Sequence, residues 1–242
     1  MIKNVLNDYP ITVILISINI SIFAVLNILV WNGIEFSSLV QDYIGFNEKA
    51  FHGEYWRFFT SLFVHVEFEH IFGNSLGLLA FGTLAERYFG RCTHILFYLS
   101  SGLLASIYNI VGHCGVDILF DANNCNNLGN SFGIGYGASG CIFGLVGMLL
   151  VYSLSNTERL FYSSIISRFF YGTSMLVYIV GALIIGHGLF SNGVVSALWG
   201  FGSPSVGFME HTHGGGFITG ILLSLLIMAL RSVKVRPNTT AF

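Results

Sequence analysis

Long runs of apolar residues, separated by short polar clusters, dominate this chain of 242 residues. A helix needs about 20 mostly apolar residues to cross a bilayer core of roughly 30 Å. By that measure the pattern predicts six transmembrane helices, at residues 10–31, 68–89, 93–112, 138–152, 169–188 and 207–230. We therefore expect an all-α, polytopic membrane protein with a single domain over residues 1–242, a core at about 10–231 and a short tail at each end.

Two of the connections between the predicted helices are long. Residues 32–67 keep apolar and aromatic side chains, so we expect this first external loop to lie in the membrane interface. Residues 113–137 are rich in Asn and Gly, which predicts an irregular external loop. This second loop holds Cys114 and Cys125, which either form a disulfide, if the outside is oxidising, or remain two free thiols.

Composition and charge agree with a membrane location. Charged residues make up 9% of the chain and hydrophobic residues 54%, with a mean hydropathy of +0.73, whereas a soluble domain carries about 25% charged residues. Lys and Arg accumulate in cytoplasmic loops, and an N-terminus inside puts eight of the ten on that side. Both termini are therefore expected in the cytoplasm. The net charge of -2 and the absence of a basic patch argue against a nucleic-acid partner.

The first apolar run is predicted to be retained as a membrane span. It is longer than the apolar region of a signal peptide and lacks a small-residue cleavage site. No transit peptide precedes it. The short N-terminal tail and the missing targeting signal lead us to expect a bacterial inner membrane.

Polar side chains lie at matching depths in three of the six predicted helices. Such groups are unfavourable inside a membrane, so each is a functional hypothesis. With a rise of about 1.5 Å per residue, Ser139 and Asn74 lie roughly 20 Å above the cytoplasmic boundary, and His70 and His213 roughly 26 Å above it. These four residues therefore share one layer, a little below the outer surface.

Glycine spacing predicts that the helices carrying Ser139 and His213 touch. Small residues four apart allow membrane helices to approach closely. One helix has Gly140 and Gly144, and the other has Gly216 and Gly220. Each pair begins just after the polar residue of its helix, so close contact there would bring the hydroxyl and the imidazole within hydrogen-bond reach.

These groups suit nucleophilic catalysis. A serine hydroxyl needs a neighbouring base, most often a histidine, so we expect His213 to take the proton of Ser139. The oxyanion that forms needs preorganised donors. His70, Asn74 and the backbone N–H of Ser139, at the positive end of a helix dipole, are the candidates. Glu210 lies too near the surface to orient His213, which predicts a dyad rather than a triad.

Together the motifs resemble the rhomboid intramembrane proteases in order, spacing and six-helix layout. They are an HxxxxHxxxN helix with His65, His70 and Asn74, a GxSG motif with Gly137, Ser139 and Gly140, and an HxGGFxxG helix with His213, Gly215, Gly216, Phe217 and Gly220. The resemblance implies a serine endopeptidase with Ser139 as nucleophile, His213 as general base and acid, and His70 and Asn74 in the oxyanion hole. It also implies transmembrane substrates that unwind near the outer face.

Further residues extend the resemblance, and Phe143, Thr212 and the unusual length of the Asn-rich loop before the GxSG motif depart from it. Trp56 and Arg57 are similar to the family's WR pair in the first external loop, although both residue types also serve as interfacial anchors. Glu86 resembles a structural acid at the end of the second span. Phe143 stands where the family often has Tyr, and its ring is still able to stack on His213.

Two other functions stay open at this point. One is a catalytically inactive rhomboid-like protein that binds membrane clients without cutting them. The other is a metal or haem protein that uses His65, His70, His211 and His213, but no Cys or carboxylate completes a clear ligand set. We therefore expect no metal and no cofactor, a supporting role for His65 in the first loop, and a structural role for His211. The expected partners are transmembrane substrates and the lipid bilayer.

Overall fold

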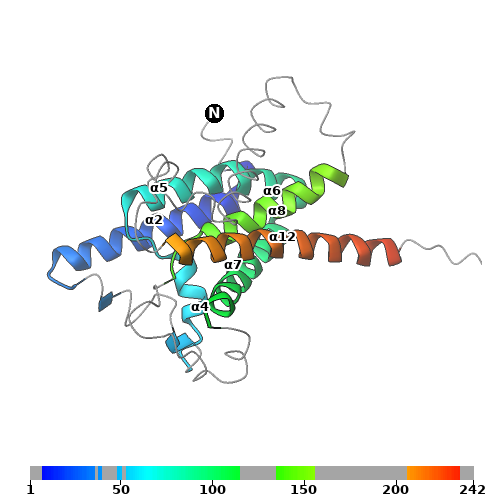
Figure 1. The fold of residues 1–242 in the computed structure, drawn as a ribbon. Coiled ribbons are helices and arrows are strands. Elements are labelled where there is room, and N and C mark those ends of the chain that lie inside the picture. The colour runs from blue at the N-terminus through cyan, green and yellow to red at the C-terminus, as the bar shows by residue number, and fades with distance from the viewer. Residues whose placement is uncertain are drawn as a thin grey trace, which may run out of the picture.

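The structure is a computed structural model, and it describes residues 7–35, 38–39, 48–50, 53–114, 135–155 and 206–234. This part of the chain is mostly helical (Figure 1). In chain order the elements are α2 (Pro10–Trp31), η2 (Glu48–Ala50), α4 (Arg57–Thr60), η3 (Ser61–Phe63), α5 (Phe68–Gly77), η4 (Leu78–Gly82), α6 (Thr83–Phe89), α7 (Arg91–Cys114), α8 (Ser139–Ser155) and α12 (Val206–Lys234).

The helices follow the predicted spans closely. Helix α2 has the predicted ends, and α5, η4 and α6 together fill the second predicted span from Phe68 to Phe89. Three helices are long and apolar enough to cross a membrane, at Pro10–Trp31, Arg91–Val111 and Thr212–Leu230, and Ser139–Tyr152 is a shorter apolar helix. The predicted span at 169–188 and most of the second external loop lie outside the described residues.

Helix α8 lies at the centre of the described part. Every residue from Gly140 to Leu149 is buried, and α7, α12 and the α5–α6 segment pack around this helix (Figure 1). The core around it includes Leu78, Tyr98 and Leu145, all fully buried. A helix that is apolar all round is either enclosed by protein or exposed to lipid. Because α8 is enclosed on all sides, the nucleophile predicted at its first residue sits on a rigid support.

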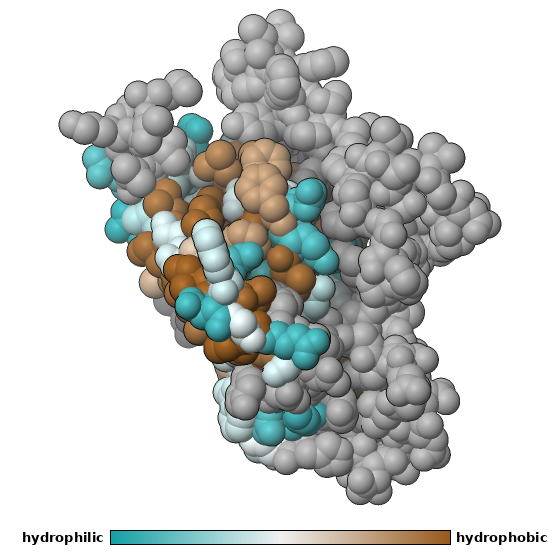
Figure 2. Space-filling view, turned by 90° about the vertical axis from the view of Figure 1, so that its left-hand side faces the viewer, coloured by the Kyte–Doolittle hydropathy of each residue, from teal (hydrophilic) through white to brown (hydrophobic). Residues whose placement is uncertain are grey.

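The outer surface of the described helices is largely apolar. Large hydrophobic side chains of α2 and α12 are exposed, among them Ile14, Val25 and Ile28 on α2 and Leu222 and Leu226 on α12. In the view of Figure 2 the described surface is mostly hydrophobic, with scattered hydrophilic groups. Contiguous apolar surface of this kind is what a lipid environment covers.

A π-helical turn interrupts the second span. In η4 the hydrogen bonds run between residues i and i+5, which adds one residue to the turn. The extra residue rotates α6, which follows the turn, relative to α5, which precedes it. Before the turn, Gly77 packs against Ile142 of α8. The Cγ2 atom of Ile142 lies 3.3 Å from the point where a Cβ added at Gly77 would be. After the turn, Glu86 faces α2. The turn therefore lets the two halves of one span face different neighbours.

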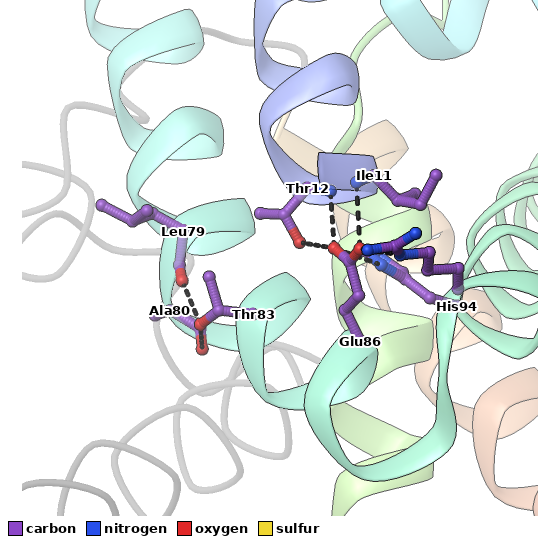
Figure 3. Close-up of polar contacts among 8 residues, drawn as sticks. Ile11, Thr12, Leu79, Ala80, Thr83, Glu86 and His94 are labelled. Carbon is purple, nitrogen blue, oxygen red and sulfur yellow. Dashed lines mark hydrogen bonds and ion pairs between the residues drawn. The ribbon is translucent and has the colours of Figure 1, made fainter. Parts of the chain in front are cut away.

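Glu86, in the first turn of α6, joins this helix to the start of α2. Its Oε1 accepts the backbone N–H of Ile11 at 3.0 Å, and its Oε2 accepts both the N–H and the hydroxyl of Thr12 at 2.9 Å (Figure 3). His94 and Arg91 approach the same carboxylate at 3.8 Å. The first N–H groups of a helix have no partner within the helix and favour a negative charge. The buried carboxylate of Glu86 therefore accepts hydrogen bonds from N–H groups of α2 that lipid would leave without an acceptor.

Trp56 and Arg57 of the first loop are neighbours in sequence, but Trp56 is exposed and Arg57 is buried. Trp56 is half exposed, as an interfacial anchor would be, whereas Arg57 is fully buried and its Nε pairs with Oε2 of Glu54. Arg57 thus departs from the anchor interpretation. A guanidinium buried with a carboxylate partner holds the loop together rather than reaching for lipid headgroups.

Candidate active site

A glycine turn leads into the helix that Ser139 begins. Gly137 has φ +114, a conformation that residues with a side chain rarely adopt. Its N–H donates to the carbonyl of Ser61 at 2.8 Å. A Cβ at Gly137 would lie 2.7 Å from Cε1 and Nε2 of His70. Both the backbone conformation and the contact with His70 therefore require glycine two residues before the predicted nucleophile.

His65 contacts Ala138, the residue between Gly137 and Ser139. Its Nε2 accepts the backbone N–H of Ala138 at 3.4 Å, while Nδ1 lies 3.3 Å from the carbonyl of Phe63. The two contacts define the neutral tautomer with the proton on Nδ1. Burial, and next the nearby His70, lower the pKa of His65 to about 3. His65 was expected to support the first loop, and it also connects that loop to the residue before Ser139.

His70 and Asn74 lie one turn apart on α5 and face the same glycine turn. The Nε2 atom of His70 and the Nδ2 atom of Asn74 are buried, and neither has a hydrogen-bond partner in the described part of the chain. Asn74 Nδ2 is 3.7 Å from the Cβ position of Gly137. Buried polar atoms are normally satisfied, so two such atoms beside the start of α8 are ready for a partner that the described residues do not supply.

His213 lies on α12, stacked against α8. Its ring is parallel to that of Phe143, with centroids 4.4 Å apart and an interplanar angle of 13°. Phe143 is one turn after Ser139 and therefore on the same face of α8. His213 is 7% exposed, and neither ring nitrogen has a hydrogen-bond partner among the described residues. Its stack fixes the ring and leaves both nitrogens available.

The close approach predicted from glycine spacing is observed. A Cβ at Gly216 would collide with the carbonyl oxygen of Gly140, and one at Gly220 with that of Gly144. Gly140 also packs on Thr212, whose Cγ2 is 3.1 Å from the glycine Cβ position. The residue after Ser139 thus touches the residue before His213, so the backbones of α8 and α12 adjoin at the level of the predicted dyad.

Two residues near the site were missed in the sequence. Tyr136 places its ring 5.8 Å from that of His70, and Oε2 of Glu67 lies 4.0 Å from Nδ1 of His70. The spacing of Glu67 and His70, three apart at a helix start, was a usable signal, whereas the place of Tyr136 depends on the fold of the loop.

Some predicted features fall outside what the structure describes. The side chains of His211 and Cys114, and the whole of Cys125, are in this class. In the described part no group of three or more His, Cys, Asp or Glu side chains is arranged to hold a metal ion.

Comparisons with known proteins point to one family. The family model for the rhomboid domain matches residues 52–230. The chain is similar to "Rhomboid protease GluP" of Bacillus subtilis (strain 168), with 30% identity over 189 residues, which are 76% of this chain and 32% of that protein. It is also similar to YdcA of the same organism, with 31% identity over 114 residues, covering 47% of this chain and 49% of YdcA.

A plant protein gives a similar match. "RHOMBOID-like protein 1" of Arabidopsis thaliana is 27% identical over 179 residues, which are 72% of this chain and 35% of that protein. The chain therefore spans about a third to a half of the length of these three relatives.

Proposed function

Because this chain belongs to the rhomboid family, we propose that it is an intramembrane serine endopeptidase that hydrolyses peptide bonds in or near transmembrane segments of other membrane proteins. It is an integral membrane protein. One observation carries the proposal: buried polar atoms of His70, Asn74 and His213 lie in the helices that meet at Ser139 and have no hydrogen-bond partner among the described residues. Unused buried hydrogen-bonding groups are unfavourable for stability, and a reacting substrate would use them.

In the proposed mechanism Ser139 is the nucleophile and His213 is the general base. The hydroxyl attacks the carbonyl carbon of the scissile peptide bond while a ring nitrogen of His213 takes its proton. The C–N bond then breaks, and His213 returns the proton to the leaving amine. In the second half of the cycle His213 takes a proton from a water molecule, whose oxygen attacks the acyl carbon. The bond from that carbon to the Ser139 oxygen then breaks, and the proton returns to this oxygen. Phe143 keeps the imidazole ring in place through this cycle.

The oxyanion forms beside donors that are already in position. The side-chain amide of Asn74, the ring of His70 and the backbone N–H of Ser139 would surround the carbonyl oxygen as it becomes negative. The start of α8 adds the positive end of a helix dipole. Preorganised donors of this kind supply a large part of the rate enhancement in acyl transfer. The chemistry needs neither a metal nor a cofactor.

The proposal includes an architecture. The six predicted spans form a single domain over residues 1–242, with the first external loop in the interface and both termini in the cytoplasm. The site then opens toward the outer side of what we take to be a bacterial inner membrane. The positions of Lys and Arg along the chain support this orientation. Its partners are transmembrane substrates and the surrounding lipid.

Cleavage of a defined substrate tests the proposal. The purified full chain in detergent is incubated with a fluorogenic peptide that contains a transmembrane segment. Wild type is expected to cleave it, and Ser139→Ala and His213→Ala are each expected to reduce kcat/KM by at least about a thousandfold. Equal cleavage by Ser139→Ala would contradict the mechanism.

Labelling with a fluorophosphonate separates a protease from an inactive relative that only binds clients. The probe reacts with an activated serine, so Ser139 should be modified in the wild type and less so in His213→Ala. Mass mapping identifies the modified residue. A wild type that binds the peptide but neither cuts it nor takes the label would be the inactive family member.

A further inference from the structure

A side-chain hydroxyl bonds to the backbone of the π turn in the second span. The residues on either side of η4, Gly77 and Thr83, keep α-helical backbone angles, so the span continues through the turn. The added residue offsets the N–H groups from the carbonyls by one position, which leaves one carbonyl without an N–H partner. Thr83 supplies a donor at this place. Its Oγ1 donates to the carbonyl of Leu79 at 2.7 Å and lies 3.3 Å from that of Ala80 (Figure 3).

This turn lies on an apolar part of the surface. Leu79 has 45% of its side chain exposed, and Ala80 is also exposed in the described part of the chain. An unpaired carbonyl is strongly unfavourable in the core of a bilayer, because lipid has no group that donates a hydrogen bond there. The hydroxyl of Thr83 therefore stabilises the π turn against a regular α-helix, in which each carbonyl would have an N–H partner.

Ser100 makes the same contacts in a regular helix. Its Oγ donates to the carbonyl of Leu96 at 2.6 Å and lies 3.4 Å from that of Phe97. Ser100 is in the middle of α7, which is α-helical from Arg91 to Cys114. In a regular α-helix the carbonyl four residues back already accepts a backbone N–H. The hydroxyl of Ser100 thus adds a second bond to a satisfied acceptor and serves as a matched comparison for the π turn.

The two halves of the span are held by different kinds of contact. After the turn, Glu86 accepts hydrogen bonds from Ile11 and Thr12 of α2. Before the turn, Gly77 packs against the apolar side chain of Ile142 on α8. One residue of an α-helix corresponds to a rotation of about 100°. Without the π turn, α5 would therefore rotate by about 100° relative to α6, because α6 is the half held by hydrogen bonds.

That rotation would turn His70 and Asn74 away from the start of α8, which they now face. We propose that Thr83 is a positioning residue, whose hydroxyl holds the π turn and so keeps these two side chains directed at the oxyanion formed on attack by Ser139. The inference rests on the proposed protease function and deepens it. Thr83 is roughly 13 Å along the helix from Asn74, so it acts through the orientation of α5 and not on the reacting atoms.

Three substitutions separate the hydroxyl of Thr83 from its volume and from ordinary helix bonding. Thr83→Val removes the hydroxyl at nearly constant volume, and Thr83→Ser keeps it. Ser100→Ala removes the matched hydroxyl from α7. For each variant kcat and KM are measured with the fluorogenic transmembrane peptide. The assay temperature is one at which thermal melting in detergent shows every variant to be folded.

The expected result is a loss in kcat that the conservative variant restores. Thr83→Val should lower kcat at least about fivefold and leave KM within about twofold of the wild type, because oxyanion donors act in the transition state. Thr83→Ser and Ser100→Ala should keep both constants within about twofold. An unchanged kcat in Thr83→Val, even with a lower melting temperature, would limit the hydroxyl to a role in stability. An equal loss in Ser100→Ala or in Thr83→Ser would also contradict the proposal.

A thiol label reports the rotation of α5 without any cleavage. Ile71 of α5 is buried, with 5% of the side chain exposed, so Ile71→Cys should react slowly with a small maleimide in detergent. Adding Thr83→Val should raise the labelling rate of this residue at least about fivefold, measured by mass mapping, whereas adding Thr83→Ser should not. An unchanged rate would overturn the role of Thr83. Failure of the protease function is distinct, because the wild type would then not cleave or Ser139→Ala would cleave equally.

Discussion

The rings of Phe143 and His213 are stacked face to face across the interface between α8 and α12, with centroids 4.4 Å apart. The contact links the face of α8 that begins with Ser139 to the proposed general base. An aromatic ring at residue 143 therefore has a role in placing the imidazole even without a hydroxyl group.

Replacing Phe143 should separate stacking from packing volume. Phe143→Leu keeps an apolar side chain but loses the stack, and aromatic contacts contribute about 0.5–1.5 kcal/mol beyond burial. We expect kcat/KM to fall about three- to tenfold, measured with the fluorogenic transmembrane peptide. Phe143→Tyr keeps the ring and should remain within about twofold of the wild type. Equal activity of the Leu variant would remove the stack from the mechanism.

His65 makes the stability of the protein sensitive to acid. Its pKa in the folded protein is about 3, against 6.5 for the ordinary group, because burial disfavours the charged ring. Between these values the unfolded chain binds more protons than the folded protein, so the stability is fully present above pH 6.5 and is lost as the pH falls toward about 3. Protonation also removes the acceptor of the Ala138 N–H.

Melting temperatures measured across this range test the assignment. The wild type should lose melting temperature more steeply below pH 6.5 than His65→Gln, which retains a polar side chain but does not titrate. Other buried histidines, such as His94, are present in both proteins and cancel in the comparison. Parallel curves would show that His65 already titrates normally in the folded protein.

The glycine contacts between α8 and α12 predict that one alanine substitution in α12 lowers the stability of the protein and that a nearby one does not. Gly216→Ala places a methyl group against the carbonyl oxygen of Gly140, whereas a Cβ at Gly214 meets no atom within 4 Å. Overpacking of this kind costs about 1–3 kcal/mol, so Gly216→Ala should lower the melting temperature and kcat/KM together. Gly214→Ala should fold as well as the wild type, because alanine favours the helix. Similar losses in both variants would argue against a specific contact.

Glu86 should affect stability without affecting chemistry. Glu86→Ala leaves the N–H groups of Ile11 and Thr12 without an acceptor, and we expect a loss of about 3 kcal/mol in thermal or chemical unfolding. At a temperature where the variant is folded, its kcat/KM should be close to that of the wild type, since Glu86 lies at the opposite end of the span from the proposed site. Arg87→Gln, at an exposed neighbouring position, serves as the control and should change neither quantity.

The helices were predictable because hydropathy is a local property. The ends of α2, and the outer ends of the segment from α5 to α6, follow directly from where apolar residues begin and stop. The contact of α8 with α12 was also predictable, since glycines four apart require a close neighbour and few other helices offered matching glycines.

Contacts between distant segments were not predictable in the same way. His65 and Ala138 are 73 residues apart, and nothing in either local sequence pairs a ring nitrogen with that backbone N–H. Arg57 was expected at the interface because Arg favours headgroups, yet it is buried, and its partner Glu54, only three residues earlier, was a local signal that this expectation overlooked. No proline marks the π turn at Leu78–Gly82 in the sequence, and its hydrogen bonding depends on packing against neighbouring helices.

That π turn offsets the two halves of the second span in rotation about the helix axis. The upper half directs His70 and Asn74 at the start of α8, and the lower half directs Glu86 at the start of α2. A continuous α-helix with the same residues would turn one of these two sets of side chains away from its neighbour. The added residue thus allows a single span to supply proposed oxyanion donors at one end and an anchor for α2 at the other, and deleting one residue of Leu78–Gly82 should misplace one of the two.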